Sequence, residues 1–130
     1  MKWITHIVCG ICVIAALSLF IHLTVADAIL GVIATILPDY VDIFFNLRHR
    51  NILTHNLLTP LPAVLLYSYP GATGFLIGYL HHLFLDSMTK QGVYIGKRRI
   101  KGTLYSRSTI DNVITIMIHY AGLMVIYKYI

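Results

Sequence analysis

The sequence predicts an all-α protein, a polytopic membrane helix bundle of about five helices in a single transmembrane domain covering residues 1–130. Three observations support this. Hydrophobic residues make up 58% of the chain. Charged residues make up only 12%, whereas soluble domains carry about 25%. The apolar residues also fall into five runs separated by polar segments. Strands are not expected, because an open sheet edge in lipid leaves backbone groups unpaired.

The five apolar runs are the expected helices, at residues 4–23, 26–37, 53–69, 72–88 and 110–130. The first and the last reach the roughly 20 residues that a membrane-spanning helix needs. The second stops at Pro38 and is short for a full crossing. The third contains Pro60 and Pro62, which kink or delay a helix. The second run is therefore the weakest part of a five-span prediction.

The basic residues predict the orientation in the membrane. If all five runs cross, nine of the ten Lys and Arg residues lie on one side, six of them between residues 90 and 107. By the positive-inside rule this side is cytoplasmic. The net charge of +5 then reflects topology and contact with anionic headgroups rather than nucleic acid. The prediction is an integral cell membrane protein with a cytoplasmic N-terminus and membrane lipids as partners.

Histidine and aspartate residues from four segments fall on the same predicted cytoplasmic side. The chain has no glutamate and only five aspartates, so carboxylate chemistry depends on the aspartates. Ionisable groups at membrane depth are costly and usually functional. Imidazole and carboxylate together are the usual ligands of zinc and related divalent metals. The converging groups are His6, Asp39, Asp42, His49, His55, His82 and Asp86.

Helical spacing indicates which way one pair of these groups points. His82 and Asp86 are four residues apart and so share one helix face. Gly78 and Gly74 continue that face, and small residues at this spacing let membrane helices approach closely. The pair is therefore expected to face the bundle interior. His81 is rotated by about 100° on an ideal helix, and its role stays open.

Four sequence blocks resemble a known family. They are TH at residues 5–6, LPDYVD at 37–42, HRNILTH at 49–55 and GYLHHLFLDSMTKQG at 78–92. Together they resemble the YdjM-like family of LexA-regulated inner-membrane metal-dependent hydrolases over about residues 5–92. The resemblance implies a metal site built from the seven residues above. It also implies phosphoester hydrolysis, since the family is thought to be distantly related to zinc phospholipase C and P1 nuclease.

The leading hypothesis is a membrane-embedded hydrolase that cleaves a phosphoester of a lipid or lipid-linked substrate at the cytoplasmic interface. One to three divalent ions, with zinc as the expected metal, would lower the pKa of a bound water to roughly 7. Asp39 and Asp42 are the candidates for the base or a metal bridge. Arg50 is the candidate to hold a phosphate bidentately.

Two alternatives lack catalysis: a metal-ion binding or transport protein, and a structural membrane protein stapled by a metal. The clustering of the polar groups on one side argues against transport. Seven candidate ligands exceed the four of a closed structural zinc site, which argues for catalysis over a staple.

Overall fold

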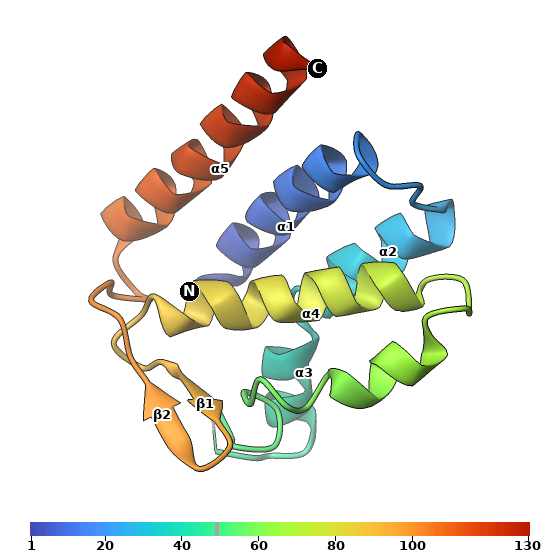
Figure 1. Ribbon diagram of the computed structural model, residues 1–130. Helices are drawn as coiled ribbons and strands as arrows, with labels where there is room; N and C mark the ends of the chain where they lie inside the picture. The colour runs from blue at the N-terminus through green and yellow to red at the C-terminus, as the bar shows by residue number, and fades with distance from the viewer. Residues whose placement is uncertain (49) are drawn as a thin grey trace.

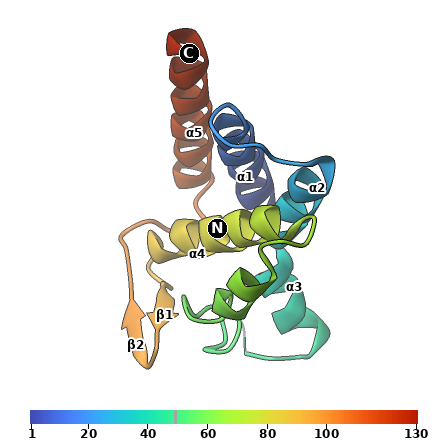
Figure 2. The same ribbon diagram turned by 45° about the vertical axis from the view of Figure 1, so that its right-hand side comes forward.

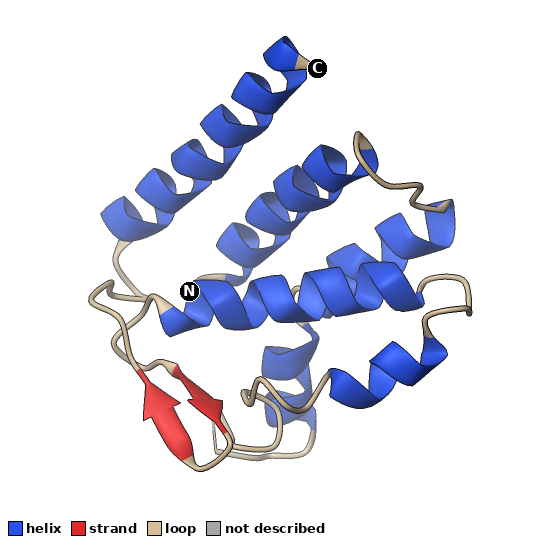
Figure 3. Cartoon of the chain, viewed as in Figure 1, coloured by secondary structure: helices blue, strands red, loops and turns tan. Residues whose placement is uncertain are grey.

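The computed structural model describes residues 1–48 and 50–130. It confirms a mostly helical chain (Figures 1 and 3). The helices are α1 (Trp3–Ser18), α2 (Val25–Ala34), α3 (Leu37–Phe44), the 3-10 helix η1 (Leu61–Leu66), α4 (Ala72–Ser87) and α5 (Thr109–Tyr129). A two-stranded antiparallel hairpin, β1 (Val93–Ile95) and β2 (Arg98–Ile100), lies between α4 and α5.

Helix α4 is the central element of the fold. It packs most extensively against α2, while α1 packs mainly against α5. In both views α4 runs across the α1–α5 pair, and α3, η1 and the hairpin lie on the other side of α4 (Figures 1 and 2). Segments far apart in the sequence therefore meet around α4.

The interior beside α4 is unusually polar. The largest fully buried side chains include His6, His55, His82, Asp42 and Asp86. Two small apolar clusters flank them. One is Ala34, Tyr79, Leu83 and Val93, and the other is Met1, Cys9 and Leu85. A buried polar centre of this kind needs a full set of partners to be stable.

Among the described residues, one helix, α5, is long and apolar enough to cross a membrane. Helices α1 and α2 are apolar but have only 16 and 10 residues. The predicted helix over residues 53–69 is wrong, because this segment forms turns and the six-residue η1. Pro60 and Pro62 lack the backbone N–H that a continuous helix requires there.

The predicted second helix is divided into two. Its end was expected at Pro38, but α2 ends at Ala34 and α3 begins at Leu37, with Pro38 in the first turn of α3. Proline is tolerated there because N–H groups of the first turn have no partner within the helix. The break turns Asp39 and Asp42 toward the interior, where both are buried.

Glycines allow α4 to approach α2 closely, as the spacing predicted. A Cβ atom on Gly74 would collide with the carbonyl group of Asp27, and one on Gly78 with that of Gly31. The Asp27 carboxylate accepts the N–H of Gly74 at 3.0 Å, which fixes the two helices together. The inward orientation of this face of α4 is confirmed.

The expectation of no strands is wrong for the hairpin. Its free edge is paired with the segment after α3. Tyr94 donates its N–H to the carbonyl of His55 at 2.7 Å and accepts the N–H of Leu57 at 2.9 Å. The Asn56 side chain bonds both the N–H and the carbonyl of Gly96, at 3.1 and 3.0 Å. With this edge satisfied, a short hairpin forms within the basic segment between α4 and α5.

Candidate metal centre

Four buried side chains each place one potential ligand atom within 4.8 Å of the others: Asp39, His55, His82 and Asp86. We call them the ligand cluster. His55 Nε2 lies 3.2 Å from Asp39 Oδ1 and 3.2 Å from His82 Nε2. Both imidazole Nε2 atoms lie 3.5 Å from Asp86 Oδ2. Tetrahedral zinc with bonds of about 2.0–2.1 Å separates its ligands by about 3.3 Å. Four of the six separations between ligand atoms are therefore close to the value for a tetrahedral ion, and all six are within 4.8 Å.

The orientation of His82 is set by the break between α2 and α3. Its Nδ1 lies 2.6 Å from the carbonyl oxygen of Thr35. A carbonyl only accepts hydrogen bonds, so Nδ1 carries the proton and Nε2 presents a lone pair to the cluster. The neutral imidazole is thus prepared as a metal ligand.

Asp42 holds His55 in a matching orientation. His55 Nδ1 lies 3.4 Å from Asp42 Oδ2 and 3.0 Å from the Thr54 hydroxyl. The same carboxylate accepts the N–H groups of Arg50 and Asn51, at 2.6 and 3.2 Å, and the Thr54 hydroxyl at 2.6 Å. Asp42, predicted as a ligand or base, therefore lies behind His55 as a positioning group, in the manner of a carboxylate–histidine–metal arrangement.

The two cluster carboxylates favour a positive charge between the four side chains. Burial alone would lower the pKa of His55. Hydrogen bonds and charge from Asp39 and Asp86 outweigh burial, so the pKa is raised above its usual 6.5. A proton on His55 or a metal ion supplies this positive charge.

His6 lies beside the ligand cluster but outside it. Its ring stacks on His82 with centroids 4.1 Å apart, and its Nε2 is 3.3 Å from Asp86 Oδ1. Both His6 ring nitrogens and Asp86 Oδ2 are buried without a hydrogen-bond partner. Unsatisfied buried atoms are costly, and a metal ion in the ligand cluster would satisfy Asp86 Oδ2. These residues therefore fit the divalent metal that the sequence implied.

Arg50 is hydrogen-bonded both to Asp86 of the ligand cluster and to Thr89, which follows α4 in the chain. Its guanidinium donates to Asp86 Oδ1 at 2.7 Å and to the Thr89 hydroxyl at 2.6 Å. Thr89 donates in turn to the Asp86 carbonyl at 2.8 Å. The Met1 amino group donates to the same Asp86 oxygen as Arg50, at 2.7 Å. Arg50 has a φ of +60°, a strained value for a non-glycine residue, and its N–H bond to Asp42 fixes it.

The predicted site residues thus fall into three groups. Four form the ligand cluster, while His6, Asp42 and Arg50 contact it. His49 lies outside the described residues. Sequence reasoning missed Thr35, Thr54 and Thr89. Thr54 stands next to His55 in the HRNILTH block, which was a usable signal, whereas a backbone carbonyl such as that of Thr35 leaves none.

His81, the neighbour whose role was open, faces away from the ligand cluster. It is buried, and its ring meets His119 of α5 edge-on, with centroids 5.2 Å apart. The pair lies on the α5 side of α4, consistent with the rotation between successive helical residues.

The sequence was compared with known protein families, curated proteins and solved structures, and the family match covers the segments that build the ligand cluster. No curated protein and no solved structure matches the chain. The family model described as "YdjM inner membrane protein" matches residues 1–121, which include the whole ligand cluster and most of α5. This match and the apolar α5 both indicate membrane association. The chain therefore belongs to the YdjM inner membrane protein family.

Proposed function

We propose that this protein is a membrane-embedded, metal-dependent hydrolase that cleaves a phosphoester of a lipid or lipid-linked substrate. The observation that carries the proposal is the ligand cluster, in which two imidazole nitrogens and two carboxylate oxygens lie within 4.8 Å of one another. Four of these separations are 3.2–3.5 Å. This donor set suits zinc. The proposal places the site at the cytoplasmic interface, with α5 in the bilayer. Further crossings by the other apolar helices stay predictions.

Each residue has a definite part in this chemistry. A divalent metal, when bound, supplies a water of lowered pKa and polarises the phosphoryl oxygens. His55 and His82 offer lone pairs because their Nδ1 atoms are engaged by Asp42 and Thr35. Asp39 is the candidate proton acceptor, because its carboxylate reaches the ligand cluster. Asp42 lies behind His55, where its Oδ2 accepts two backbone N–H groups and its Oδ1 accepts the Thr54 hydroxyl. Arg50, held by Asp86, orients the phosphate.

A metal-stapled structural protein is the second candidate, and one observation favours it. Asp39 is only 3% exposed and the other three residues of the ligand cluster are fully buried. Four protein ligands without solvent access are typical of structural zinc, whereas catalytic zinc keeps one position open. The cluster would then tie α3, the segment after it and α4 together.

Metal analysis and a hydrolysis assay on the same purified protein separate these candidates. We expect wild type to retain zinc, and Asp86→Asn to lose both zinc and hydrolysis of a phosphoester panel containing phosphatidic acid and p-nitrophenyl phosphate. Asp111→Asn, at the start of α5 and far from the cluster in sequence, is the matched control and should keep both. Activity should vanish with EDTA and return with zinc.

Two results would contradict the proposal in different ways. Zinc that stabilises the fold without hydrolysis of any panel member would support the structural staple. Full zinc occupancy in the double variant His82→Ala/Asp86→Ala would exclude the ligand cluster as the metal site.

A further inference from the structure

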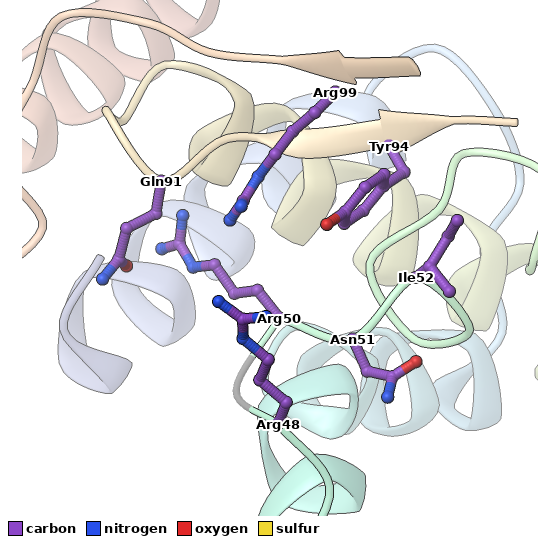
Figure 4. Close-up of a pocket in the computed structure, with 7 residues that line it drawn as sticks. All are labelled: Arg48, Arg50, Asn51, Ile52, Gln91, Tyr94 and Arg99. Carbon is purple, nitrogen blue, oxygen red and sulfur yellow. The ribbon is translucent and has the colours of Figure 1, made fainter. Parts of the chain in front are cut away.

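A basic cavity of about 600 Å³ lies next to the ligand cluster. Figure 4 shows Arg48, Arg50 and Arg99 directing their guanidinium groups toward one another across it. Its lining residues are Arg48, Arg50, Asn51, Ile52, Gln91, Tyr94 and Arg99, none of them acidic. Arg99 comes from the hairpin and the other two arginines from the segment after α3, so two distant parts of the chain build the cavity.

A second cavity of about 220 Å³ shares Arg50 and Gln91 with the first. Lys2 and Arg107 also line it. Positively charged side chains from four parts of the chain therefore surround two adjoining spaces. Cations gathered at this density repel one another unless an anion offsets them.

Within residues 1–48 and 50–130, no aspartate is paired with Arg48 or Arg99. The chain has five aspartates and no glutamate. Within the described part of the chain, each aspartate is engaged elsewhere. Asp27 caps α2, Asp111 accepts the N–H of Tyr105 at the start of α5, and the remaining three form or support the ligand cluster. The positive charges of Arg48 and Arg99 are thus not offset by an aspartate of the described chain.

Arg50 connects this cavity to the ligand cluster. It is only 4% exposed, and its Nε is buried without a hydrogen-bond partner although its other nitrogens bond Asp86 and Thr89. The Arg50 and Arg99 guanidinium groups point toward each other across the cavity (Figure 4), so their charges repel each other.

The hairpin holds Arg99 in place at the cavity. Its guanidinium carbon lies 5.3 Å from the centre of the Tyr94 ring, a cation–π distance. Tyr94 is itself bonded to the His55 carbonyl. The cation is therefore preorganised relative to the ligand cluster, which reduces the entropic cost of binding an anion.

We propose that this cavity binds a phosphate group, contacted by Arg48 and Arg99, with Arg50 as the link to Asp86. Arginine forks match phosphate oxygens bidentately. The inference rests on the proposed function in that it specifies the substrate class as one bearing a terminal phosphate, either a soluble phosphate ester or a phospholipid headgroup. Binding itself requires no metal.

The test measures anion binding to the EDTA-treated full chain in detergent by calorimetry. The probes are inorganic phosphate, dioctanoyl phosphatidic acid and dioctanoyl phosphatidylcholine. Arg48→Gln and Arg99→Gln should each weaken phosphate and phosphatidic acid binding about tenfold, the loss of one charge-assisted contact. Arg98→Gln is the matched control, since it removes the same charge from the same hairpin but does not line the cavity. It should stay within about twofold.

The arms of the experiment distinguish the sources of the phosphate. Tighter binding of phosphatidic acid than of phosphate, with none of phosphatidylcholine, identifies a lipid headgroup, and equal binding of the first two identifies a soluble ester. Absence of saturable phosphate binding, or equal weakening by Arg98→Gln and Arg99→Gln, would overturn the proposal.

This failure is distinguishable from failure of the proposed function. Phosphate binding that responds to Arg99→Gln without any metal-dependent hydrolysis leaves the anion site standing and removes the hydrolase. Metal-dependent hydrolysis with an unchanged KM in Arg48→Gln and Arg99→Gln removes the anion site and leaves the hydrolase. Because Arg48 and Arg99 are exposed, neither substitution should impair folding, and thermal unfolding of each variant checks this.

Discussion

At the scale of single residues, the atom behind each imidazole decides which nitrogen faces the ligand cluster. The Thr35 carbonyl does this for His82, and the Asp42 carboxylate does it for His55. Partners of this kind orient the ring and raise its basicity as a ligand. The functional unit is therefore larger than the four residues whose atoms would touch a metal.

Comparison of His82→Ala with His81→Ala tests whether His82 is a metal ligand and its sequence neighbour is not. His82→Ala removes an inward lone pair, so zinc affinity should fall by more than the roughly 10–100-fold typical of losing an orienting group. His81→Ala removes an imidazole one position away that faces α5, and should leave affinity unchanged. Competition titration with a zinc chelator measures both, and equal losses would contradict the assignment.

The two aspartates of α3 should affect zinc binding in different ways when each is replaced by asparagine. Asp39→Asn removes a ligand, so zinc should no longer be retained at a stoichiometric level. Asp42→Asn removes only the group behind His55, so one zinc should still bind with affinity reduced about 10–100-fold. Stoichiometry by elemental analysis and affinity by titration separate the two effects. Equal loss of zinc by both variants would return Asp42 to the ligand role that the sequence predicts, and equal retention would remove Asp39 from it.

The raised pKa of His55 predicts a pH dependence with a definite sign. Its proton stabilises the metal-free fold below the usual pKa of 6.5, and this contribution is lost as pH rises through the raised value. Zinc displaces the proton, so zinc affinity should rise over the same window. Thermal unfolding of EDTA-treated wild type and His55→Gln between about pH 5 and 8 isolates the effect as a difference. Parallel curves for the two proteins would contradict it.

Sequence reasoning predicted some of these residues better than others. His82 and Asp86 were found because their spacing on a helix with Gly74 and Gly78 fixes a face. The sequence predicts Asp42 as a ligand or base, but spacing cannot show that its Oδ2 accepts two backbone N–H groups and its Oδ1 the Thr54 hydroxyl.

At the scale of elements, close contact between α2 and α4 is what brings His82 to the Thr35 carbonyl. Gly31, Gly74 and Gly78 leave no space for a side chain at this contact. The helix ends expected for α4 and α5, residues 72–88 and 110–130, differ from the observed ones by at most one residue. The first helix, predicted over residues 4–23, instead ends at Ser18, so an apolar run does not by itself define a helix end. The proline-containing segment 53–69 and the hairpin depend on tertiary pairing.

A single methyl group at this contact should be costly. Gly78→Ala places a Cβ against the Gly31 carbonyl, and overpacking of this kind costs about 1–3 kcal/mol of unfolding free energy. Gly122→Ala, in α5 with nothing within 4 Å of the added atom, should be neutral or stabilise by up to about 1 kcal/mol. Chemical denaturation in detergent compares them, and a neutral Gly78→Ala would show that the helices separate readily.

At the scale of the whole molecule, the hairpin and α3 lie on one side of α4, while α1 and α5 extend on the other side (Figure 2). The basic cavity is built from the hairpin and the segment after α3. The gathering of most Lys and Arg residues in the hairpin and its neighbouring segments, away from the apolar α5, is the arrangement expected of a protein held at a membrane by that helix. Composition predicted a membrane protein but not the number of crossings, since among the described residues α5 alone has the necessary length.

Labelling of the hairpin tests the proposed orientation. Lys97→Cys introduces an exposed thiol, and Cys9 and Cys12 are both buried. A membrane-impermeant maleimide should label the new thiol in inverted membrane vesicles but not in intact cells, because the basic hairpin is expected in the cytoplasm. Replacing Cys9 and Cys12 by alanine controls for background. Labelling from the outer face alone would reverse the orientation.

The contact between Arg50 and Asp86 has a thermodynamic consequence. The same Asp86 carboxylate faces both the ligand cluster and Arg50, so the two ligands proposed for this protein share one residue pair. An anion drawing charge from Arg50 leaves Asp86 a stronger donor to a metal, and a metal on Asp86 frees Arg50 for an anion. Linkage requires these effects to be equal in free energy. A cation and an anion would thus recruit each other, and neither affinity has a single value unless the concentration of the other is stated.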